Sequence, residues 1–373
     1  MTTTSTTSRL WQPLELGTVR LDNRLVLAPL TRRRAAENGT PTPLMADYYA
    51  QRSGFGLVIT EGIYPSREGR AYPNQPGLVD DAHEHGWATV IDAIHAHGTP
   101  IFAQLMHAGR ITSPEITGTD TVLAPTAIDF EDHIGHHSAR HTTAATSGDI
   151  SQLIDAHVQA AERARRAGFD GIELHAANGY LLQQFLAPST NHRTDDYGGS
   201  PHRRARFVID VADAVSDAIG ADRVGIRVSP GANIQGALEP DEQDVAATYA
   251  ALFGSLRTRP LAYVSMVHPD AGSALVQNIR RTSGSPMILN TGFSAVTDRQ
   301  TADGLIDAGH GEAVAVGRAA IANPDLPHRW RAGRPENFPD RTTFYVGGAA
   351  GYTDYPTDDA PQQDLAAHQR HDH

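Results

Sequence analysis

Three hydrogen-bonding side chains stand close together after an apolar run in the stretch GFDGIELHAANGYLLQQFLAPSTNHRTDDYGG, residues 168–199. They are the imidazole of His175, the amide of Asn178 and the phenol of Tyr180. By local rules, His175 ends a strand and caps the next helix, Asn178 forms a turn, and Tyr180 is a half-buried core aromatic. Alternatively, the three groups gather over a ligand. The choice depends on the elements that position them.

Further polar residues end or interrupt apolar runs. Arg227 lies inside RVGIRVSP, and an arginine within an apolar strand is costly unless its charge is paired. A structural ion pair is the alternative to a role in ligand binding. Thr31 fits a helix cap at a strand end as well as a ligand contact, and Gln104 fits a buried amide satisfied by the backbone.

A histidine-rich segment, HIGHHSARH, raises the question of a metal site. It contains His133, His136, His137 and His141. The segment shows no regular period and offers no carboxylate geometry, whereas metal sites need ligands held in a fixed arrangement. A solvated loop or a lid over a substrate is the preferred interpretation, and we predict no metal site.

Composition narrows the class of protein. The 373 residues carry a formal net charge of −12 and no cysteine, which excludes disulfides, thiolate metal sites and a cysteine nucleophile. Binding to nucleic acid needs clustered Lys and Arg, and a membrane span needs about 18 apolar residues in a row; neither pattern occurs. The first residues lack the pattern of a secretory signal. We expect a cytoplasmic monomer or homodimer that acts on a small molecule, with flexible tails at residues 1–8 and 358–373.

Eight short runs rich in Val, Ile and Leu predict strands, at residues 25–30, 56–62, 100–105, 169–175, 223–229, 261–267, 286–292 and 312–321. Amphipathic segments of helical length, such as 81–98 and 149–168, separate most of them. Buried strands that alternate with helices form parallel sheets, and eight such units close into a (β/α)₈ TIM barrel. We therefore predict a single domain with its barrel at about 20–335 and an insertion, a loop or small β element, at about 107–149 over the barrel mouth.

Active sites of such barrels form at the carboxyl ends of the strands. The predicted strands end near amide, cationic, imidazole and hydroxyl groups, with glycines in the last two turns. A polar heterocycle lying across the mouth fits this rim, and its phosphate would lie over the last two strands, where glycine lets backbone N–H groups come close. The rim residues are Pro29, Leu30, Thr31, Gly62, Gln104, His175, Arg227, His268, Thr291, Gly292, Phe293, Gly317 and Arg318.

At this point the sequence resembles one family along nearly its whole length, the Old Yellow Enzyme family of FMN-dependent ene-reductases. The resemblance rests on LDNRLVLAPLTRRRA, HAANGYLLQQFLAPSTNHRTDDYGGSPHRRARF, RVGIRVSP, VGRAAIANPDLPHRW and FYVGGAAGYTDYP. It implies a (β/α)₈ barrel that holds FMN, with NAD(P)H as reductant and an alkene conjugated to a carbonyl or nitro group as oxidant. VGGAAG alone would not indicate a dinucleotide loop, because it does not join a strand to a helix.

The resemblance also implies roles for the rim residues. Thr31 would bond near the flavin O4, Gln104 would pair with the pyrimidine edge, and Arg227 would stabilise the reduced flavin near N1 and O2. Backbone contacts to the ring would come from Pro29, Leu30 and Gly62. The phosphate would be bound by Gly292, Phe293, Gly317 and Arg318, with Thr291 in the same turn.

The same resemblance resolves the opening question. His175 and Asn178 match the pair that holds the electron-withdrawing oxygen of the substrate, and two donors aimed at that oxygen stabilise its developing charge. Tyr180 matches the proton donor, and a phenol with an ordinary pKa near ~10 is protonated at neutral pH. Tyr72 and Tyr345 match aromatic residues of the substrate pocket.

The sequence departs from the family pattern in three places. Met106 replaces a tryptophan found in many relatives, which predicts a wider or more deformable substrate pocket. The segment HHSARHTTAATSGDISQLI lacks the usual lid sequence, and Thr291 in NTGFS stands where a smaller residue is common. Two alternatives to an ene-reductase follow: a biosynthetic desaturase or isomerase dedicated to one metabolite, and a non-catalytic flavin-binding relic.

Overall fold

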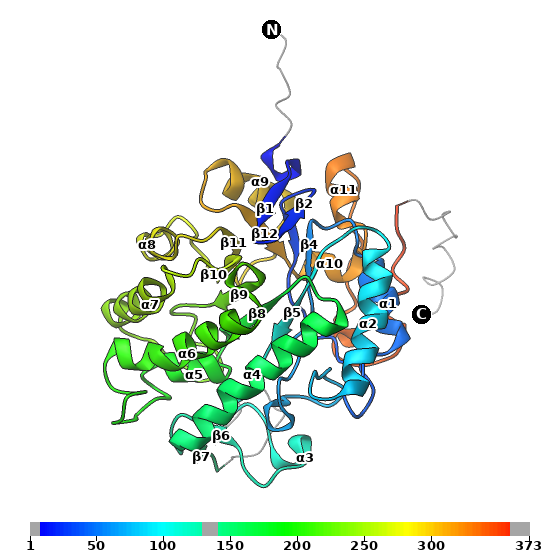
Figure 1. The fold of residues 1–373 in the computed structure, drawn as a ribbon. Coiled ribbons are helices and arrows are strands. Elements are labelled where there is room, and N and C mark those ends of the chain that lie inside the picture. The colour runs from blue at the N-terminus through cyan, green and yellow to red at the C-terminus, as the bar shows by residue number, and fades with distance from the viewer. Residues whose placement is uncertain (1–7, 129–140, 359–373) are drawn as a thin grey trace, which may run out of the picture.

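The computed structural model describes residues 8–128 and 141–358. Eight parallel strands close into a barrel, as the sequence predicted, and the helices surround it (Figure 1). Nearly every strand residue is buried, because the strands face side chains inside the barrel and helices outside it. In barrel order the strands are β3 (Leu25–Leu27), β4 (Leu57–Ile59), β5 (Ile101–Leu105), β8 (Gly171–Ala176), β9 (Val224–Val228), β10 (Tyr263–Val267), β11 (Met287–Asn290) and β12 (Ala313–Val316).

Capping residues set the helix ends. Thr146 and Asp149 form a capping box at the start of α4, and Gly168 ends that helix with a φ of 106°. The helix therefore begins two residues before the predicted segment at 149. The helices are α1 (Pro43–Ala50), α2 (Asp81–His95), α3 (Pro114–Thr117), α4 (Ser147–Ala167), α5 (Leu181–Leu186), α6 (Pro201–Ile219), α7 (Glu242–Leu256), α8 (Ala274–Ser283), α9 (Arg299–Asp307), α10 (Arg318–Ala322) and α11 (Leu326–Ala332), with 3₁₀ turns η1 (Arg9–Trp11), η2 (Arg67–Gly69), η3 (Ala221–Arg223) and η4 (Arg341–Thr343).

A short hairpin closes the amino-terminal end of the barrel. Its strands, β1 (Leu14–Leu16) and β2 (Val19–Leu21), pair antiparallel. Leu16 and Leu21 are fully buried in one apolar cluster with Phe102 and Tyr263 from the barrel interior. The hairpin and the insertion lie at opposite ends of the molecule in Figure 1. The hairpin therefore covers the amino-terminal end of the barrel interior.

Several predicted boundaries are wrong. The eighth strand ends at Val316, not at 321, and Arg318 begins α10. The insertion contains α3 and a two-stranded parallel sheet, β6 (Leu123–Ala124) and β7 (Thr143–Ala144), and it ends before α4. His133, His136 and His137 lie outside the described residues.

Parts of the predicted tails have defined contacts. Ser8 caps η1 and donates a hydrogen bond to Asp303 Oδ1 (2.5 Å). The backbone N–H of Asp358 donates to Asp325 Oδ2 (2.7 Å). Ser8 and Asp358 therefore make defined contacts with the rest of the fold, and the other residues of the two predicted tails lie outside the described part of the chain.

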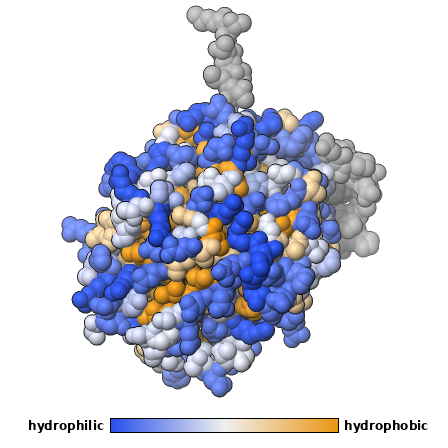
Figure 2. Space-filling model, in the orientation of Figure 1, coloured by the Kyte–Doolittle hydropathy of each residue, from blue (hydrophilic) through white to orange (hydrophobic). Residues whose placement is uncertain are grey.

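Hydrophilic side chains cover most of the face shown in Figure 2, with hydrophobic residues visible between them. Within the described ranges, no helix is both long enough and apolar enough to cross a lipid bilayer. The apolar residues instead form two large clusters. One packs helices against the strands, and the other fills the barrel interior under the hairpin.

The hairpin contributes to stability independently of the opposite end of the barrel. Leu21→Ala should lower the free energy of unfolding by about 2–5 kcal/mol, because it leaves a cavity in a fully buried cluster. The exposed Glu15→Ala on the same hairpin is the matched control and should change it by less than about 0.5 kcal/mol. Urea unfolding followed by circular dichroism measures both. Equal stability of the two variants would mean that the hairpin is not packed as described.

Candidate active site

A cavity of about 560 Å³ opens at the carboxyl end of the strands. It combines residues from the barrel rim with residues of the carboxyl-terminal segment. Further lining residues that the sequence analysis did not single out include Arg33, Ile234, Gln235, Asn290 and Phe344. The predicted site residues on its wall are Pro29, Leu30, Thr31, Tyr72, Gln104, Met106, His175, Asn178, Tyr180, Arg227, Gly292, Phe293, Gly317, Arg318 and Tyr345.

Three predicted rim residues, Gly62, His268 and Thr291, do not line this cavity. Gly62 lies behind Met106, and a Cβ atom at Gly62 would come within 2.6 Å of the Met106 sulfur. Its carbonyl accepts a hydrogen bond from Gln75 Nε2 (2.8 Å). The hydroxyl of Thr291 is bonded to that of Thr297 (2.7 Å). Gly62 thus makes room for Met106, and Thr291 braces the turn that carries Gly292.

His175 is the next-to-last residue of β8, and its buried side chain lies at the wall of the cavity. Its Nδ1 accepts a hydrogen bond from the backbone N–H of Ala177 (3.3 Å), which places the proton of the neutral ring on Nε2. Burial holds the pKa of His175 well below its usual value, and the charge of Arg227 lowers it further. His175 is therefore a neutral imidazole whose Nε2–H remains available as a donor.

Asn178 and Gly179 both have left-handed backbone conformations, with φ of 58° and 79°. Side chains bind both of their N–H groups. Asn178 N–H donates to Ser229 Oγ (2.8 Å), and Gly179 N–H donates to Gln183 Oε1 (2.8 Å). Ser229 Oγ in turn donates to Gln183 Oε1 (3.1 Å). These bonds tie the turn to the end of β9.

The carbonyls of the same turn are bound by side chains too. Gln235 Nε2 donates to the Asn178 carbonyl (2.7 Å), and Gln184 Nε2 donates to the Gly179 carbonyl (2.8 Å). We call Gln183, Gln184, Ser229 and Gln235 the amide bracket. The bracket thus holds a turn whose backbone is strained. The side-chain oxygen Oδ1 of Asn178 is buried and has no hydrogen-bond partner within the described residues.

Tyr180 lies beside both the histidine and a second tyrosine. Its ring meets that of His175 edge-on, with centroids 5.0 Å apart, and its hydroxyl lies 2.9 Å from the Tyr72 hydroxyl. Burial raises the pKa of Tyr180 well above its usual value, and Tyr72 adds to this shift. Met106 packs in the same small apolar cluster. Tyr180 thus remains protonated at neutral pH.

Arg227 brings a positive charge into the barrel with only 5% of its surface exposed. Its Nη1 donates to Ser265 Oγ (3.1 Å), while its Nε has no hydrogen-bond partner within the described residues. Burial lowers the pKa of Arg227, and the charge of Glu173 opposes that shift. Gln104 stands on the neighbouring part of the floor. A buried cation of this kind favours a ligand that carries or develops negative charge.

At the far end of the cavity, β11 is followed by a turn that contains Gly292, and β12 is followed by Gly317. Gly292 has a φ of 86°, and its N–H donates to Asn290 Oδ1 (3.1 Å). Arg318 begins α10 and donates to the Ala295 carbonyl. Phe293, 60% exposed, stands at this edge. A guanidinium beside glycine turns suits an anionic group such as a phosphate.

The segment 343–351, here called the strap, covers one side of the cavity with Phe344 and Tyr345. Arg34 donates to the carbonyls of Thr343, Phe344 and Val346 at 2.6–3.0 Å. Arg32 binds the carbonyls of Phe344 (3.0 Å) and Gly351 (2.7 Å). Two buried arginines thus fasten the strap through its backbone.

These groups fit the flavin that the resemblance implies. The cavity volume is in the range of small-molecule sites, about 300–1,000 Å³. The amide of Gln104 and the cation of Arg227 stand at the floor, and a second cation, Arg318, stands at the edge beside Gly292. The described residues contain no group of three or more metal-binding side chains.

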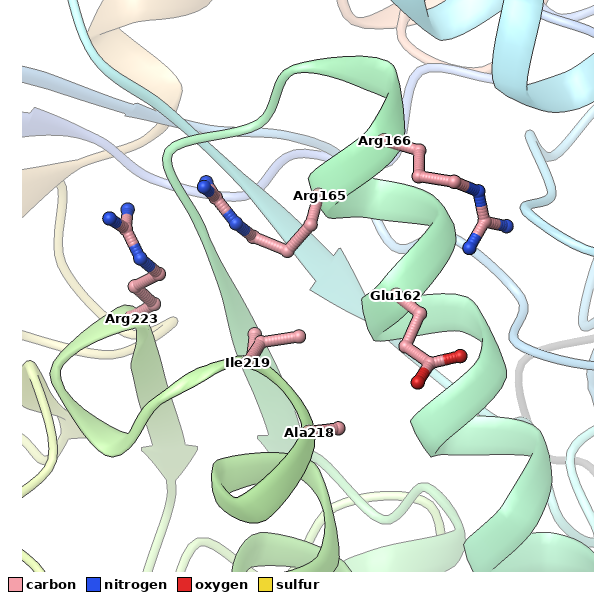
Figure 3. Close-up of a pocket in the computed structure, with 6 residues that line it drawn as sticks. All are labelled: Glu162, Arg165, Arg166, Ala218, Ile219 and Arg223. Carbon is pink, nitrogen blue, oxygen red and sulfur yellow. The ribbon is translucent and has the colours of Figure 1, made fainter.

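A second hollow, at the amino-terminal end of the strands, does not offer such a site (Figure 3). Arg165 and Arg223 lie on one side of it, and Arg166 points away. Arg165 and Arg223 each donate to the Asp170 carbonyl, and Arg166 pairs with Glu84. Their guanidinium groups are thus hydrogen-bonded or ion-paired within the protein at an open surface.

Comparisons with known proteins match this architecture. The model of the NADH:flavin oxidoreductase / NADH oxidase family matches residues 9–337. A Leishmania infantum protein named probable flavin mononucleotide-dependent alkene reductase is 37% identical over 356 residues, which cover 92% of this chain and 96% of that protein.

Solved structures agree as well. An Old Yellow Enzyme homologue from Zymomonas mobilis superposes with a TM-score of 0.87 at 35% identity, over 93% of this chain and 99% of its own. Morphinone reductase in complex with tetrahydroNAD has a TM-score of 0.85 at 40% identity, over 95% and 99%. Because sequence and fold agree along almost the entire length, the chain belongs to the NADH:flavin oxidoreductase / NADH oxidase family, as its resemblance to Old Yellow Enzyme had indicated.

Proposed function

We propose that this protein is an FMN-dependent ene-reductase driven by NAD(P)H, with Tyr180 as the proton donor to an activated alkene. The observation that carries the proposal is the convergence of His175, Asn178 and Tyr180 on one cavity whose floor holds Arg227. FMN, when bound, supplies two-electron chemistry, taking hydride from NAD(P)H and giving it to the β-carbon of the alkene.

His175 and Asn178 orient the substrate by its electron-withdrawing oxygen. Hydride arrival at the β-carbon moves negative charge onto that oxygen. The Nε2–H of His175 and the side-chain amide of Asn178 donate to it there. Because His175 is neutral and the amide bracket fixes the turn at Asn178, both donors are in position before the charge develops.

Tyr180 completes the reduction by giving its proton to the α-carbon. Its raised pKa keeps the proton in place until the carbon has gained electron density. The hydroxyl of Tyr72, 2.9 Å away, is positioned to return a proton to Tyr180. Tyr72, Tyr345 and Met106 then shape the pocket around the alkene, and Met106 leaves it deformable.

Arg227 and Arg318 hold the two ends of the cofactor in this proposal. Arg227 stabilises the charge that reduction adds to the ring, and Arg318 faces the phosphate beside Gly292 and Gly317. Gln104 would pair with the pyrimidine edge of a bound flavin, Thr31 would bond near O4, and the backbones of Pro29 and Leu30 would contact the ring. Gly62 and Thr291 support these groups from behind the wall.

The proposed function is tested by absorbance spectroscopy. The purified protein, reconstituted with FMN, should be yellow, should bleach when NADPH or NADH is added without oxygen, and should regain its colour on addition of 2-cyclohexenone. A protein that binds no FMN would refute the proposal. Binding and bleaching without reoxidation by generic enones would favour the dedicated desaturase or isomerase.

Tyr180→Phe separates the two half-reactions. We expect reoxidation by 2-cyclohexenone to slow by about 10²–10⁴-fold, because the general acid is lost, while reduction by NADPH keeps its rate. Stopped-flow absorbance measures both rates. Tyr72→Phe, which leaves the Tyr180 hydroxyl in place, should slow reoxidation far less. If both variants slowed reoxidation equally, Tyr180 would not be the distinct proton donor proposed here.

A further inference from the structure

Glu173 is a carboxyl group buried inside the barrel, one layer beneath the cavity. It lies on β8, is fully buried and does not line the cavity. Its Oε1 accepts a hydrogen bond from Gln104 Nε2 (2.8 Å). Burying a carboxyl group in an apolar barrel is costly, and Glu173 Oε2 has no hydrogen-bond partner within the described residues.

The bond to Glu173 determines which atom Gln104 can offer to a ligand. A glutamine amide has a donor end and an acceptor end. Since the donor end is turned toward Glu173, the carbonyl Oε1 is the end left for the cavity. Gln104 is thereby oriented as an acceptor, which suits an N–H group at the edge of a heterocycle.

Glu173 also affects the net charge at the floor of the cavity, where Arg227 lies. Arg227 faces it from β9, while Tyr263 and Ser265 face it from β10; the partner from β5, Gln104, is uncharged. Each of the four lowers the pKa of Glu173, and Arg227 has the largest effect among them. An ionised Glu173 therefore offsets part of the positive charge that Arg227 presents to the cavity.

We propose that Glu173 sets the reduction potential of the bound flavin, by offsetting the charge of Arg227 and by orienting Gln104. The inference rests on the proposed binding of FMN. Two-electron reduction adds negative charge to the ring, and Arg227 favours that charge while an ionised Glu173 disfavours it. Glu173 acts through Arg227 and Gln104 and is a positioning residue.

The sign of the pH effect follows from this arrangement. Burial raises the pKa of Glu173 above its usual value, so the group becomes neutral at a higher pH than an exposed glutamate. Glu173→Gln removes the negative charge and keeps an oxygen that can accept from Gln104. Above the pKa of Glu173, the variant should have the more positive potential. As the pH falls through that pKa, the difference should disappear, because the wild-type group is then neutral too.

The experiment measures the midpoint potential of FMN-loaded protein by equilibration with reference dyes, from about pH 5 to about pH 9. At the alkaline end, we expect Glu173→Gln to favour the reduced flavin at least tenfold more than wild type does, a shift of about 30 mV for two electrons. Glu312→Gln, at the amino-terminal end of β12 and paired with Arg280, is the matched carboxyl control and should leave the potential unchanged.

Tyr263→Phe provides a second variant should Glu173→Gln fail to fold. The Tyr263 hydroxyl is buried on β10, has no hydrogen-bond partner within the described residues and lowers the pKa of Glu173. Without it, Glu173 stays neutral to a higher pH and the potential shifts in the same direction. Potentials equal to wild type at every pH would overturn the inference while leaving the proposed function intact. A wild-type protein that binds no FMN would overturn both.

Discussion

Closure of eight parallel strands forces their carboxyl ends onto one rim, and this constraint places residues that are distant in the sequence around one cavity. It also brings Arg227 into the apolar interior, where its charge cannot be solvated. Two features stabilise that charge. Glu173 lies beneath Arg227, and the cavity above it has space for an electron-accepting ligand. The neutral state of His175 follows from the same arrangement, since burial and a neighbouring cation both disfavour a second positive charge.

The barrel and most of its rim could be predicted from the sequence, because strands buried on both faces stand out as apolar runs. The rim residues then followed from where those runs end. The eighth strand was predicted too long for the same reason: α10 (Arg318–Ala322) is short and buried beyond its first residue, so its composition looks like more strand. Periodicity cannot separate a buried strand from a buried helical turn over so few residues.

Other features depend on contacts that no local pattern encodes. The hairpin strands β1 and β2 have three residues each, too few for an alternation to be visible. The two glutamines in LLQQFL could have indicated a buried hydrogen-bond network. Gln183 and Gln184 interrupt an apolar helical turn, and buried amides must be hydrogen-bonded. Ser229, the partner of Gln183, lies at another strand end 46 residues further along the chain, and only the folded barrel brings it beside Asn178.

The attachment of the strap bears on how this enzyme could evolve. Arg32 and Arg34 donate hydrogen bonds to main-chain oxygens of the strap rather than to particular side chains. Every amino acid has such an oxygen. Replacing Phe344 or Tyr345 would therefore leave the attachment in place while reshaping one wall of the cavity. The glycines of the strap are less free to change, because Gly347 and Gly351 have positive φ and a Cβ atom at Gly351 would clash with Thr343 Oγ1. Variation in the strap is therefore best tolerated at its aromatic side chains, whose shape can change while the backbone attachment stays the same.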